Sequence, residues 1–253
     1  MSRSAEGFGI DIGGTGMKGA PVDLDKGEFA EERHRISTPH PSTPDAVAGV
    51  VAEIVDHFGK HAGDRPIGIT VPAVVQRGVV RTAANIDQAW IGTDAEGLFG
   101  RRLASEVHVV NDADAAGVAE VRYGAARGTT GLVLVATLGT GIGTALLLDG
   151  ALVPNSELGH IEIDGHDAED RAAARQREQE DLSWEEYAER LQRYFATIED
   201  LLWPDLIVVG GGVSKRSDRF LPLLHLRAPI VAAQLHNTAG VVGAAAVASE
   251  RSG

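Results

Sequence analysis

Asn111 and Asp112 follow the apolar run Val107–Val110, so they place an amide and a carboxylate where a strand is expected to end and a helix to begin. A carboxylate at such a junction can accept a proton from a bound hydroxyl group and act as a general base. Asn and Asp also cap helices, because their side chains accept hydrogen bonds from the first free backbone N–H groups. Taken alone, the two residues fit either catalysis or capping.

Three glycine-rich turns follow apolar runs and indicate a ligand with several phosphates. Glycine has no side chain, so the backbone N–H groups of such turns can approach phosphate oxygens closely. None of the turns matches the signature of a Rossmann or Walker site, and each alone is a weak signal. The candidate residues are Gly13, Gly14 and Thr15 in the first turn, Thr137, Gly139, Thr140 and Gly141 in the second, and Gly211 and Gly212 in the third.

Asp11 lies just before the first turn, and Lys18 lies just beyond it. A carboxylate in this place can hold Mg²⁺, usually through water, and the lysine can pair with a phosphate group. Lys18 can equally be a surface amine. Asp11 is therefore the candidate metal residue and Lys18 a candidate donor-binding residue.

Glu157 and His160 lie three residues apart after the second turn, so one face can present both side chains. Zinc needs further ligands and no cysteine is near, so we expect hydrogen bonds to a polyhydroxylated substrate, with a buried, internally bonded histidine as the alternative. Asn85 and Trp90 lie in a loop that can reach the same substrate, although Trp90 can also simply pack. A reactive hydroxyl, phosphate-binding turns and a carboxylate together describe phosphoryl transfer.

The elements that position these residues repeat along the chain. Phe8–Ile12 and Leu132–Leu138 each read as a strand that enters a glycine turn and returns as a second strand, with Asp11 matching Thr137. This repeat predicts two α/β lobes of related topology. We expect residues 1–110 to form the N-terminal lobe, with a C-terminal helix from about 240 to 253 packing back on it, and residues 111–239 to form the C-terminal lobe.

Two helices stand out between the strands. Pro44–Phe58 carries apolar residues at helical spacing, and Ser183 opens a second helix through a capping box with an aromatic stripe that we assign to the core. The densely charged stretch 164–181, which includes Arg171, Arg175 and Arg177, reads mostly as a solvated helix face or excursion.

Composition narrows the class of protein. The chain has 253 residues, of which 43% are hydrophobic and 23% charged, no cysteine, and a formal net charge of -13. This balance argues against a general nucleic-acid binder, and no run is long and apolar enough to cross a membrane. The absence of cysteine removes disulfides and thiolate zinc sites. We therefore expect a cytoplasmic globular protein with no nucleic-acid or membrane partner.

Five motifs together resemble the ROK family of sugar kinases. They are Asp11-Ile12-Gly13-Gly14-Thr15, Asn111-Asp112-Ala113, Leu138-Gly139-Thr140-Gly141, Glu157-Leu158-Gly159-His160 and Val209-Gly210-Gly211-Gly212. Within the family, Ala83–Asp87 with Trp90, and Gly159–Glu169, look like the bacterial polyphosphate glucokinases, including the polyphosphate/ATP glucomannokinase type. The similarity covers nearly the whole chain.

The resemblance implies the two-lobed, actin-like ATPase (ribonuclease H-like) fold of hexokinases, with the sugar deep in the cleft between the lobes. Asp112 is then the general base for the 6-hydroxyl of glucose, and possible sugars extend to mannose. Mg²⁺ and either polyphosphate or ATP are the implied cofactor and donors. The implied sugar ligands are Asn85, Asn111, Asp112, Glu157, His160 and Glu169.

The chain departs from the family pattern in two places. Residues 164–171 stand where most members carry a cysteine-rich zinc motif, so His160 is expected to bind sugar without zinc. Pro72-Ala73 replaces the usual Pro-Gly pair, which puts the hydrogen bonds of that loop in doubt. Lys18, Lys215 and Arg216 can supply local positive potential for a polyanion, although the last two also fit a solvated helix start.

Several alternatives stay open at this level. An ATP-only glucokinase or fructokinase is the nearest one. A sugar-responsive regulator would carry a helix-turn-helix region ahead of the first strand, which here starts by Phe8, and a pseudokinase fits poorly with Asp11 and Asp112 both present. We expect a homodimer, to which the apolar, aromatic helix from Ser183 to Trp203 can contribute a face.

Overall fold

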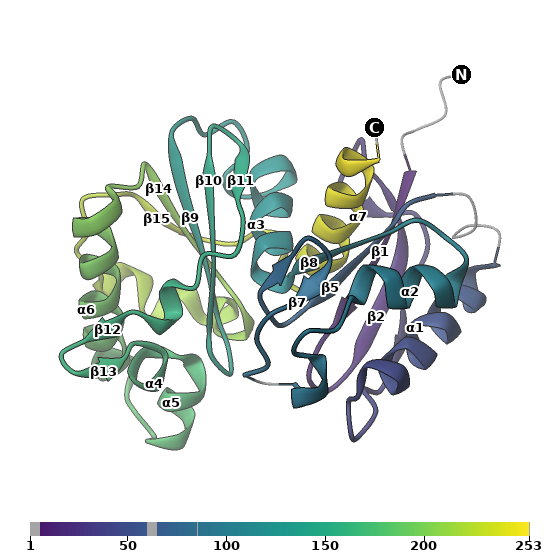
Figure 1. Cartoon of the computed structure of the whole chain (residues 1–253). Helices are drawn as coiled ribbons and strands as arrows, with labels where there is room; N and C mark the ends of the chain where they lie inside the picture. Colours follow the sequence, from purple (N-terminus) through teal and green to yellow (C-terminus); the bar gives the residue numbers. More distant parts are fainter. Residues whose placement is uncertain (1–5, 60–64, 85, 253) are drawn as a thin grey trace. The chain divides into compact units, whose positions relative to one another are not determined.

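The computed structural model describes residues 6–59, 65–84 and 86–252. The chain forms two compact units, each built on its own mixed sheet (Figure 1). Unit 1 combines Met1–Ala119 with Thr238–Gly253, and unit 2 comprises Glu120–Asn237. The division falls inside helix α3 (Asp112–Tyr123). Residues 111–119, which the sequence assigned to the second lobe, cluster with unit 1 because Asn111 ends a strand of its sheet and α3 packs closely on the C-terminal helix.

The sheet of unit 1 has the strand order β3-β2-β1-β5-β8, and β4 also pairs with β2. Strands β1 and β2 are antiparallel, whereas β1, β5 and β8 run parallel, so the carboxyl ends of these three meet at one edge. The strands are β1 (Glu6–Ile12), β2 (Met17–Asp23), β3 (Glu28–Phe29), β4 (His34–Ile36), β5 (Ile67–Val71) and β8 (Val107–Asn111); β6 (Val75–Gln76) and β7 (Val79–Val80) form a separate hairpin.

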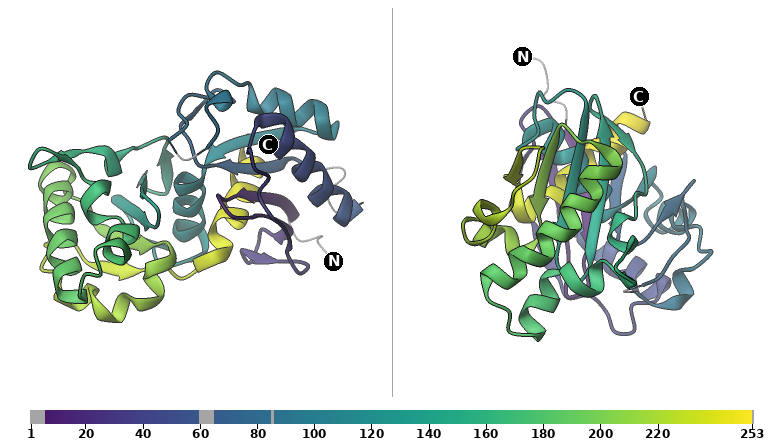
Figure 2. Two further views of the ribbon diagram at one scale, coloured as in Figure 1. Left: turned by 90° about the horizontal axis from the view of Figure 1, so that it is seen from below. Right: turned by 90° about the vertical axis from the view of Figure 1, so that its left-hand side faces the viewer.

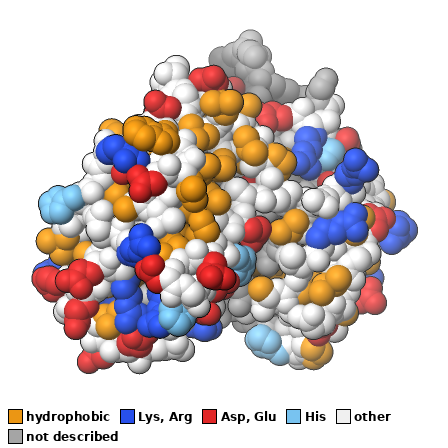
Figure 3. Space-filling view, turned by 60° about the vertical axis from the view of Figure 1, so that its left-hand side comes forward, with side chains coloured by type: hydrophobic (Ala, Val, Ile, Leu, Met, Phe, Trp, Pro, Cys, Tyr) orange, Lys and Arg blue, Asp and Glu red, His pale blue; other side chains and the backbone are white. Residues whose placement is uncertain are grey.

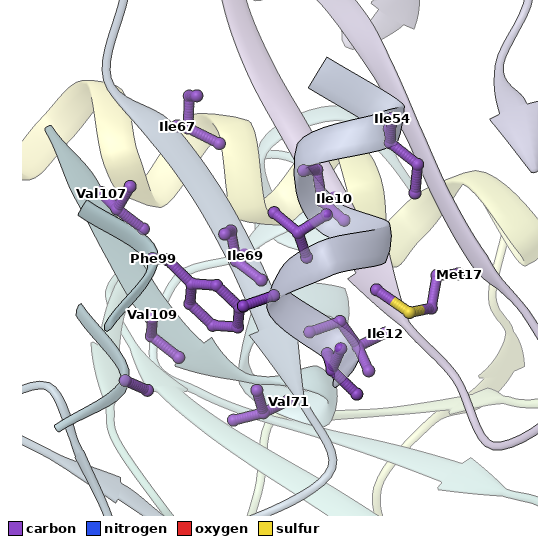
Figure 4. Packing of buried hydrophobic residues seen from close by; sticks show 14 of the residues in the cluster. Ile10, Ile12, Met17, Ile54, Ile67, Ile69, Val71, Phe99, Val107 and Val109 are labelled. Carbon is purple, nitrogen blue, oxygen red and sulfur yellow. The ribbon is translucent and has the colours of Figure 1, made fainter. Parts of the chain in front are cut away.

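Helices α1 (Pro44–Phe58) and α2 (Ala95–Leu103) cover one face of this sheet, and α7 (Ala239–Arg251) covers the other (Figure 2). Helix α1 forms as predicted: Thr43 accepts a hydrogen bond from the Ala46 amide, and Pro44 occupies the first turn. Its apolar stripe, which includes Ile54, packs on the strands in a core of aliphatic side chains (Figure 4). Each fully buried aliphatic side chain of this kind contributes roughly 1.5–3 kcal/mol.

Helix α7 lies directly on the strands because two glycines of the sheet leave room for its backbone. A Cβ atom on Gly9 would lie 1.9 Å from the Val241 carbonyl oxygen, and one on Gly68 would lie 1.9 Å from that of Ala244. Any larger residue at either position would push the helix off the sheet. The last helix of the chain is therefore an integral layer of unit 1.

Unit 2 repeats the topology of unit 1. Its sheet has the order β11-β10-β9-β14-β15, with an antiparallel hairpin followed by two parallel neighbours, as in β3-β2-β1-β5-β8. The predicted repeat is thus confirmed, and Asp11 and Thr137 hold the same place in their strands. The strands are β9 (Leu132–Leu138), β10 (Ile142–Leu148), β11 (Ala151–Val153), β14 (Leu206–Gly210) and β15 (Ile230–Ala232).

The remaining elements of unit 2 pack on or beside this sheet. Helix α6 (Trp184–Leu202) starts with the predicted capping box between Ser183 and Glu186, and its aromatic stripe lies in the core of the unit. Only the end of α6 exposes large apolar side chains, with Leu201 62% and Trp203 68% exposed. Unit 2 also contains β12 (Glu162–Ile163), β13 (His166–Asp167), α4 (Glu169–Ala172) and α5 (Ala174–Gln179).

The surface is mixed in charge despite the acidic total. Figure 3 shows acidic side chains close to basic ones over much of the visible face. Several pairs of this kind lie in unit 2, where Arg190 contacts Glu180 and Arg193 contacts Asp164. No helix in the described part of the chain is both long enough and apolar enough to cross a membrane.

Candidate functional site

Asp11 lies at the carboxyl end of β1 and is held from two sides. Lys18, directly opposite in the β1–β2 pairing, places its Nζ 2.7 Å from one carboxylate oxygen, and the Thr70 hydroxyl donates to the other at 2.9 Å. The first turn of α7 lies beside the carboxylate, since a Cβ on Gly240 would be 2.9 Å from Asp11 Cγ. The positive end of a helix favours a carboxylate there. Lys18 is therefore an ion-pair partner of Asp11 within unit 1.

The first glycine turn continues from this strand. The Gly13 amide donates to the Gly16 carbonyl at 3.2 Å, and the Thr38 hydroxyl donates to the Gly13 carbonyl at 2.5 Å. A cavity of about 210 Å³ beside the turn is lined in part by Gly14, Pro72 and Trp90. Trp90 is 1% exposed. Its indole nitrogen donates to the Ser42 carbonyl, so this side chain packs into the fold while lining the cavity.

Asn111 and Asp112 divide the two roles that the sequence left open. The Asn111 side-chain oxygen accepts hydrogen bonds from the amides of Ala113 and Asp114, at 2.8 and 3.1 Å, which caps α3. Its amide nitrogen donates to the Ala73 carbonyl at 3.1 Å. Asp112 is the first residue of the helix, is half-buried and accepts a hydrogen bond from the Ala113 amide. Asn111 is thus the cap of α3, and Asp112 adds a hydrogen bond to the same first turn.

The predicted residues of unit 1 lie along one sheet edge. Asp11 pairs with Thr70 across β1 and β5, and Thr70 pairs with Val110 across β5 and β8. Adjacent strands are about 4.8 Å apart, so the ends of β1 and β8 are separated by roughly 10 Å along the sheet. Asp11, near the end of β1, and Asp112, directly after β8, therefore lie at the same edge of the sheet, the usual place of ligands in parallel sheets. Asn85 lies outside the described residues.

The second and third glycine turns meet at the equivalent edge of unit 2. Gly210 pairs with Thr137 across β14 and β9, so both turns start from neighbouring strands. The Gly139 amide donates to the Gly141 carbonyl at 3.0 Å, and Thr137 donates to the Gly143 carbonyl. Gly211 has φ 82°, and a Cβ there would lie 2.2 Å from the Leu138 carbonyl, so the fold itself requires this glycine.

Three other glycines of the turns are not required by the fold. A Cβ atom added to Gly14, Gly139 or Gly212 would have no described atom within 4 Å, and none of the three has a positive φ. An alanine would fit at each position as far as the described chain is concerned. The open space leaves the backbone of these three residues accessible to a ligand.

Four polar residues gather at the exit of the β9–β10 hairpin. His160 Nδ1 lies 2.9 Å from Asp167 Oδ2, and His160 Nε2 lies 3.8 Å from Glu157 Oε2. Glu169 accepts a hydrogen bond from the Ile142 amide at 3.0 Å, and its charge acts on both Glu157 and His160. Thr144 fixes the preceding turn by accepting from the Leu158 amide. The three sugar ligands predicted in this unit are thus brought together.

The cluster shifts the acidity of two of its members. The hydrogen bond to Asp167 raises the pKa of His160, and the charges of Glu169 and Glu157 act in the same direction. Burial raises the pKa of Glu157, with Glu169 adding to the effect and His160 opposing it. A histidine paired in this way is a fixed hydrogen-bond donor towards a hydroxyl group, and the nearby carboxylates are acceptors.

Sequence reasoning did not assign Asp167. Its second oxygen accepts a hydrogen bond from the Glu169 amide at 3.1 Å, so the residue contacts both the first residue of α4 and His160. The available signal was a carboxylate seven residues after the histidine, just before Glu169. It was missed because a short hairpin, β12–β13, brings it back to His160.

Residues 164–171 occupy the place where most members of the family resembled carry a zinc motif, and they contain no cysteine. Here Arg193 of α6 binds Asp164 through two nitrogens, at 2.8 and 2.7 Å, and Arg171 contacts His166 at 2.9 Å. Ion pairing and hydrogen bonds tie this segment to the rest of unit 2. Among residues 6–59, 65–84 and 86–252, no group of three or more His, Asp or Glu side chains is arranged to hold a metal ion.

Comparisons with known proteins extend these observations. The model of the ROK family matches residues 7–174. The polyphosphate glucokinase of Mycobacterium tuberculosis (strain H37Rv) is 50% identical over 240 residues, which cover 94% of this chain and 89% of that protein. The polyphosphate glucokinase of Mycobacterium leprae is 51% identical over 240 residues, which cover 94% and 73% respectively.

Solved structures agree in fold. The inorganic polyphosphate/ATP-glucomannokinase from Arthrobacter sp. strain KM has a TM-score of 0.93 and 55% identity, covering 98% of this chain and 99% of that one. A ROK family glucokinase from Streptomyces griseus, in complex with glucose and AMPPNP, has a TM-score of 0.81 and 24% identity, covering 97% and 100%. The expected actin-like ATPase fold is therefore confirmed, and the chain belongs to the ROK family.

Proposed function

We propose that this protein phosphorylates glucose at its 6-hydroxyl, using inorganic polyphosphate and ATP as phosphoryl donors. The observation that carries the proposal is the similarity over nearly the whole chain to polyphosphate glucokinases and to a polyphosphate/ATP-glucomannokinase. The geometry supports it. The glycine turns lie at the ends of strands, have room for a ligand, and are at the same sheet edges as the candidate acid and sugar-binding residues.

Asp112 acts as the general base in this proposal. It accepts the proton of the 6-hydroxyl while that oxygen attacks the terminal phosphorus, and the bond from phosphorus to the leaving phosphate breaks. Support comes from the position of Asp112, a half-buried acid that directly follows β8 at the carboxyl edge of the sheet. Asp112 also starts a helix, where backbone dipoles favour its charged form.

Replacing Asp112 by Asn tests the base. The amide keeps an oxygen that can accept the Ala113 hydrogen bond, so we expect the melting temperature to stay within about 2 °C. General-base catalysis contributes roughly 10²–10⁴-fold, so kcat should fall by about a thousandfold. Asp45→Asn, in the first turn of α1, is the matched control and should retain full turnover. Full activity of Asp112→Asn excludes the base assignment.

Sugar binding falls to Glu157, His160 and Glu169 in unit 2, with Asn111 and Asn85 as further contributors. A protonated His160 donates, and the carboxylates accept, which suits neighbouring hydroxyl groups of a pyranose. The hydrogen bond between His160 Nδ1 and Asp167 at 2.9 Å fixes the imidazole in this arrangement. Because the chain is 55% identical to a polyphosphate/ATP-glucomannokinase, we also propose mannose as a second acceptor.

The donor phosphates are bound by the three glycine turns, and Asp11 holds Mg²⁺ through water. When bound, Mg²⁺ neutralises charge on the phosphates and polarises the group that is transferred. The residues fit this ion, since Mg²⁺ in such sites needs only one or two carboxylates in addition to the donor oxygens, and Asp11 is fixed by Thr70 and Lys18. Turnover should stop with a chelator and return with added Mg²⁺.

A coupled assay separates the proposal from its nearest alternative, an ATP-only glucokinase or fructokinase. Glucose, mannose and fructose are each offered with polyphosphate or ATP at matched phosphate concentration. We expect glucose 6-phosphate from both donors; turnover with ATP alone excludes the polyphosphate assignment. Binding of sugar without turnover points instead to a sugar-responsive regulator.

We also propose that the protein is a cytoplasmic homodimer. Most of the aromatic stripe of α6 lies inside unit 2, so the dimer face we had expected there reduces to its end, where Leu201 and Trp203 are exposed. Sedimentation of wild type and Trp203→Ser tests this: the variant should shift towards monomer.

A further inference from the structure

One segment of unit 2, residues 167–175, contacts both the proposed sugar-binding cluster and the second glycine turn. At its start, Asp167 Oδ2 lies 2.9 Å from His160 Nδ1. At its end, the Arg175 amide donates a hydrogen bond to the Gly139 carbonyl at 3.0 Å. This linking segment therefore joins the residues proposed to bind the sugar to a turn proposed to bind the donor.

Within the linking segment, the side chain of Glu169 lies against the turn itself. Its Oε2 accepts a hydrogen bond from the Ile142 amide at 3.0 Å, and its own amide donates to Asp167 at 3.1 Å. A Cβ atom on Gly141 would overlap Glu169 Oε2 and lie 3.1 Å from Glu169 Cδ. Gly141 has no positive φ, so the contact with the carboxylate is what a larger residue at this position would disturb.

The linking segment holds the turn at both ends and leaves its middle accessible. The backbone of Arg175 is bonded to the turn at Gly139, where the turn begins. The carboxylate of Glu169 is bonded to it at Ile142, where β10 begins. A Cβ on Gly139 would meet no described atom within 4 Å, so a ligand can reach this backbone without displacing the linking segment. A movement of the Glu169 carboxylate, in contrast, acts directly on the Ile142 amide.

Glu169 also belongs to the sugar-binding cluster. Its charge acts on Glu157 and on His160, so all three side chains lie within electrostatic reach of one another. Glu169 Oε1 accepts no hydrogen bond from any residue that the structure describes, whereas Oε2 is bonded to Ile142. A sugar hydroxyl can therefore donate to Oε1 while Oε2 keeps its bond to the turn, and such charge-assisted hydrogen bonds are strong.

We propose that Glu169 is a positioning residue that couples the two substrates. A sugar hydroxyl that donates to Oε1 fixes the carboxylate, and the fixed carboxylate holds the Ile142 amide and the adjoining turn in place for the donor. This rests on the proposed function and adds an energetic link to it, because the donor binds more tightly once the sugar is present. By linkage, the donor tightens sugar binding by the same factor.

Charge acts in the same direction. A carboxylate beside a turn that binds an anion opposes the donor, and a hydrogen bond from the sugar offsets part of the negative charge. Both the geometry and the charge of Glu169 therefore favour the donor when the sugar is bound.

The test measures donor affinity by calorimetry with and without a sugar. Long-chain polyphosphate is titrated with Mg²⁺ into the protein alone and into the protein saturated with 6-deoxyglucose, which lacks the hydroxyl that would accept the phosphoryl group. For the wild type we expect the Kd for polyphosphate to fall about tenfold when the sugar is present. In Glu169→Ala the two Kd values should agree within about twofold, because the link is lost.

Glu157→Ala is the matched control. It shortens another carboxylate of the same cluster, and Glu157 forms no hydrogen bond or ion pair with the turn in the part of the chain that the structure covers. The control should bind 6-deoxyglucose more weakly than the wild type does, and at saturating sugar it should keep the roughly tenfold effect on polyphosphate. A loss of sugar affinity is thereby separated from a loss of coupling.

A second measurement needs no variant. In an NMR titration of the wild type, 6-deoxyglucose alone should shift the amide signal of Ile142, and the amide of Leu201 at the far end of α6 should not respond. An unshifted Ile142 signal overturns the inference, and so does undiminished coupling in Glu169→Ala. A wild type that binds both ligands without coupling also overturns it and leaves the proposed function standing. A wild type that binds neither ligand contradicts the proposed function, and the inference with it.

Discussion

Replacing Gly240 by alanine should reduce turnover without unfolding the protein. The new Cβ would lie 2.9 Å from Asp11 Cγ and 3.1 Å from each carboxylate oxygen, where ordinary contacts begin at 3.4 Å. Relief requires the carboxylate to move by about half an ångström, away from positions fixed by Lys18 and Thr70. Since a misplacement of 1 Å can cost about a hundredfold in rate, we expect kcat to fall roughly tenfold.

Stability should change little in the same variant. Alanine in a helix is favoured over glycine by up to about 1 kcal/mol, which offsets part of the strain of roughly 1–3 kcal/mol. The melting temperature should therefore shift by no more than about 8 °C, since 1 kcal/mol corresponds to roughly 2–4 °C in a chain of this size. Steady-state kinetics with each donor and calorimetry give the two quantities.

Gly49→Ala is the matched control, because Gly49 lies inside α1 of the same unit and a Cβ there meets no described atom within 4 Å. This change should stabilise the protein by about 0.5–1 kcal/mol and leave kcat unchanged. Wild-type turnover in a folded Gly240→Ala protein would refute the reasoning that the position of Asp11 limits catalysis.

Two further predictions concern unit 2. Asp167→Asn removes the main cause of the raised pKa of His160, so the pH at which His160 loses its proton in an NMR titration should fall. In the wild type, the stability that the charged pair contributes is present below pH 6.5 and is lost as the pH rises through the raised pKa. An unchanged titration of His160 in the variant contradicts the pairing. Tyr194→Phe should stabilise the protein by about 1 kcal/mol in thermal unfolding, because its buried hydroxyl has no hydrogen-bond partner among the described residues. Tyr187→Phe, on the same helix, removes a hydrogen bond to the Ala172 carbonyl and should destabilise it; equal effects of the two changes would argue against this reading.

Local patterns predicted the parts of the fold that depend on neighbouring residues. The capping oxygen of Asn111 bonds two amides within three residues, and the matched hairpins end in glycine turns that can be read directly. The helix from Ser183 was likewise predicted from its capping box and stripe. Patterns of this kind are visible in a single sequence because each depends on short-range spacing.

Contacts between distant segments were not predictable in the same way. Arg175 lies in a charged run that reads as solvated, and only the fold places it beside Gly139. The sequence did suggest that the last helix packs back on the first lobe, but not that its backbone contacts the sheet at Gly9 and Gly68. A glycine inside a strand has several explanations, and the partner backbone that selects one of them lies more than 170 residues away.

The close packing of α7 on Gly9 and Gly68 has a consequence for biosynthesis. Helix α7 follows the whole of unit 2 in the chain, so a ribosome makes residues 120–237 before the helix that covers one face of the sheet of unit 1. At typical rates this interval lasts roughly ten seconds. Throughout it, the sheet face around Gly9 and Gly68 lacks its covering layer, and Asp11 lacks the helix end that lies beside its carboxylate. During this interval the chain of unit 2 becomes complete, whereas unit 1 still lacks the segment that covers one face of its sheet.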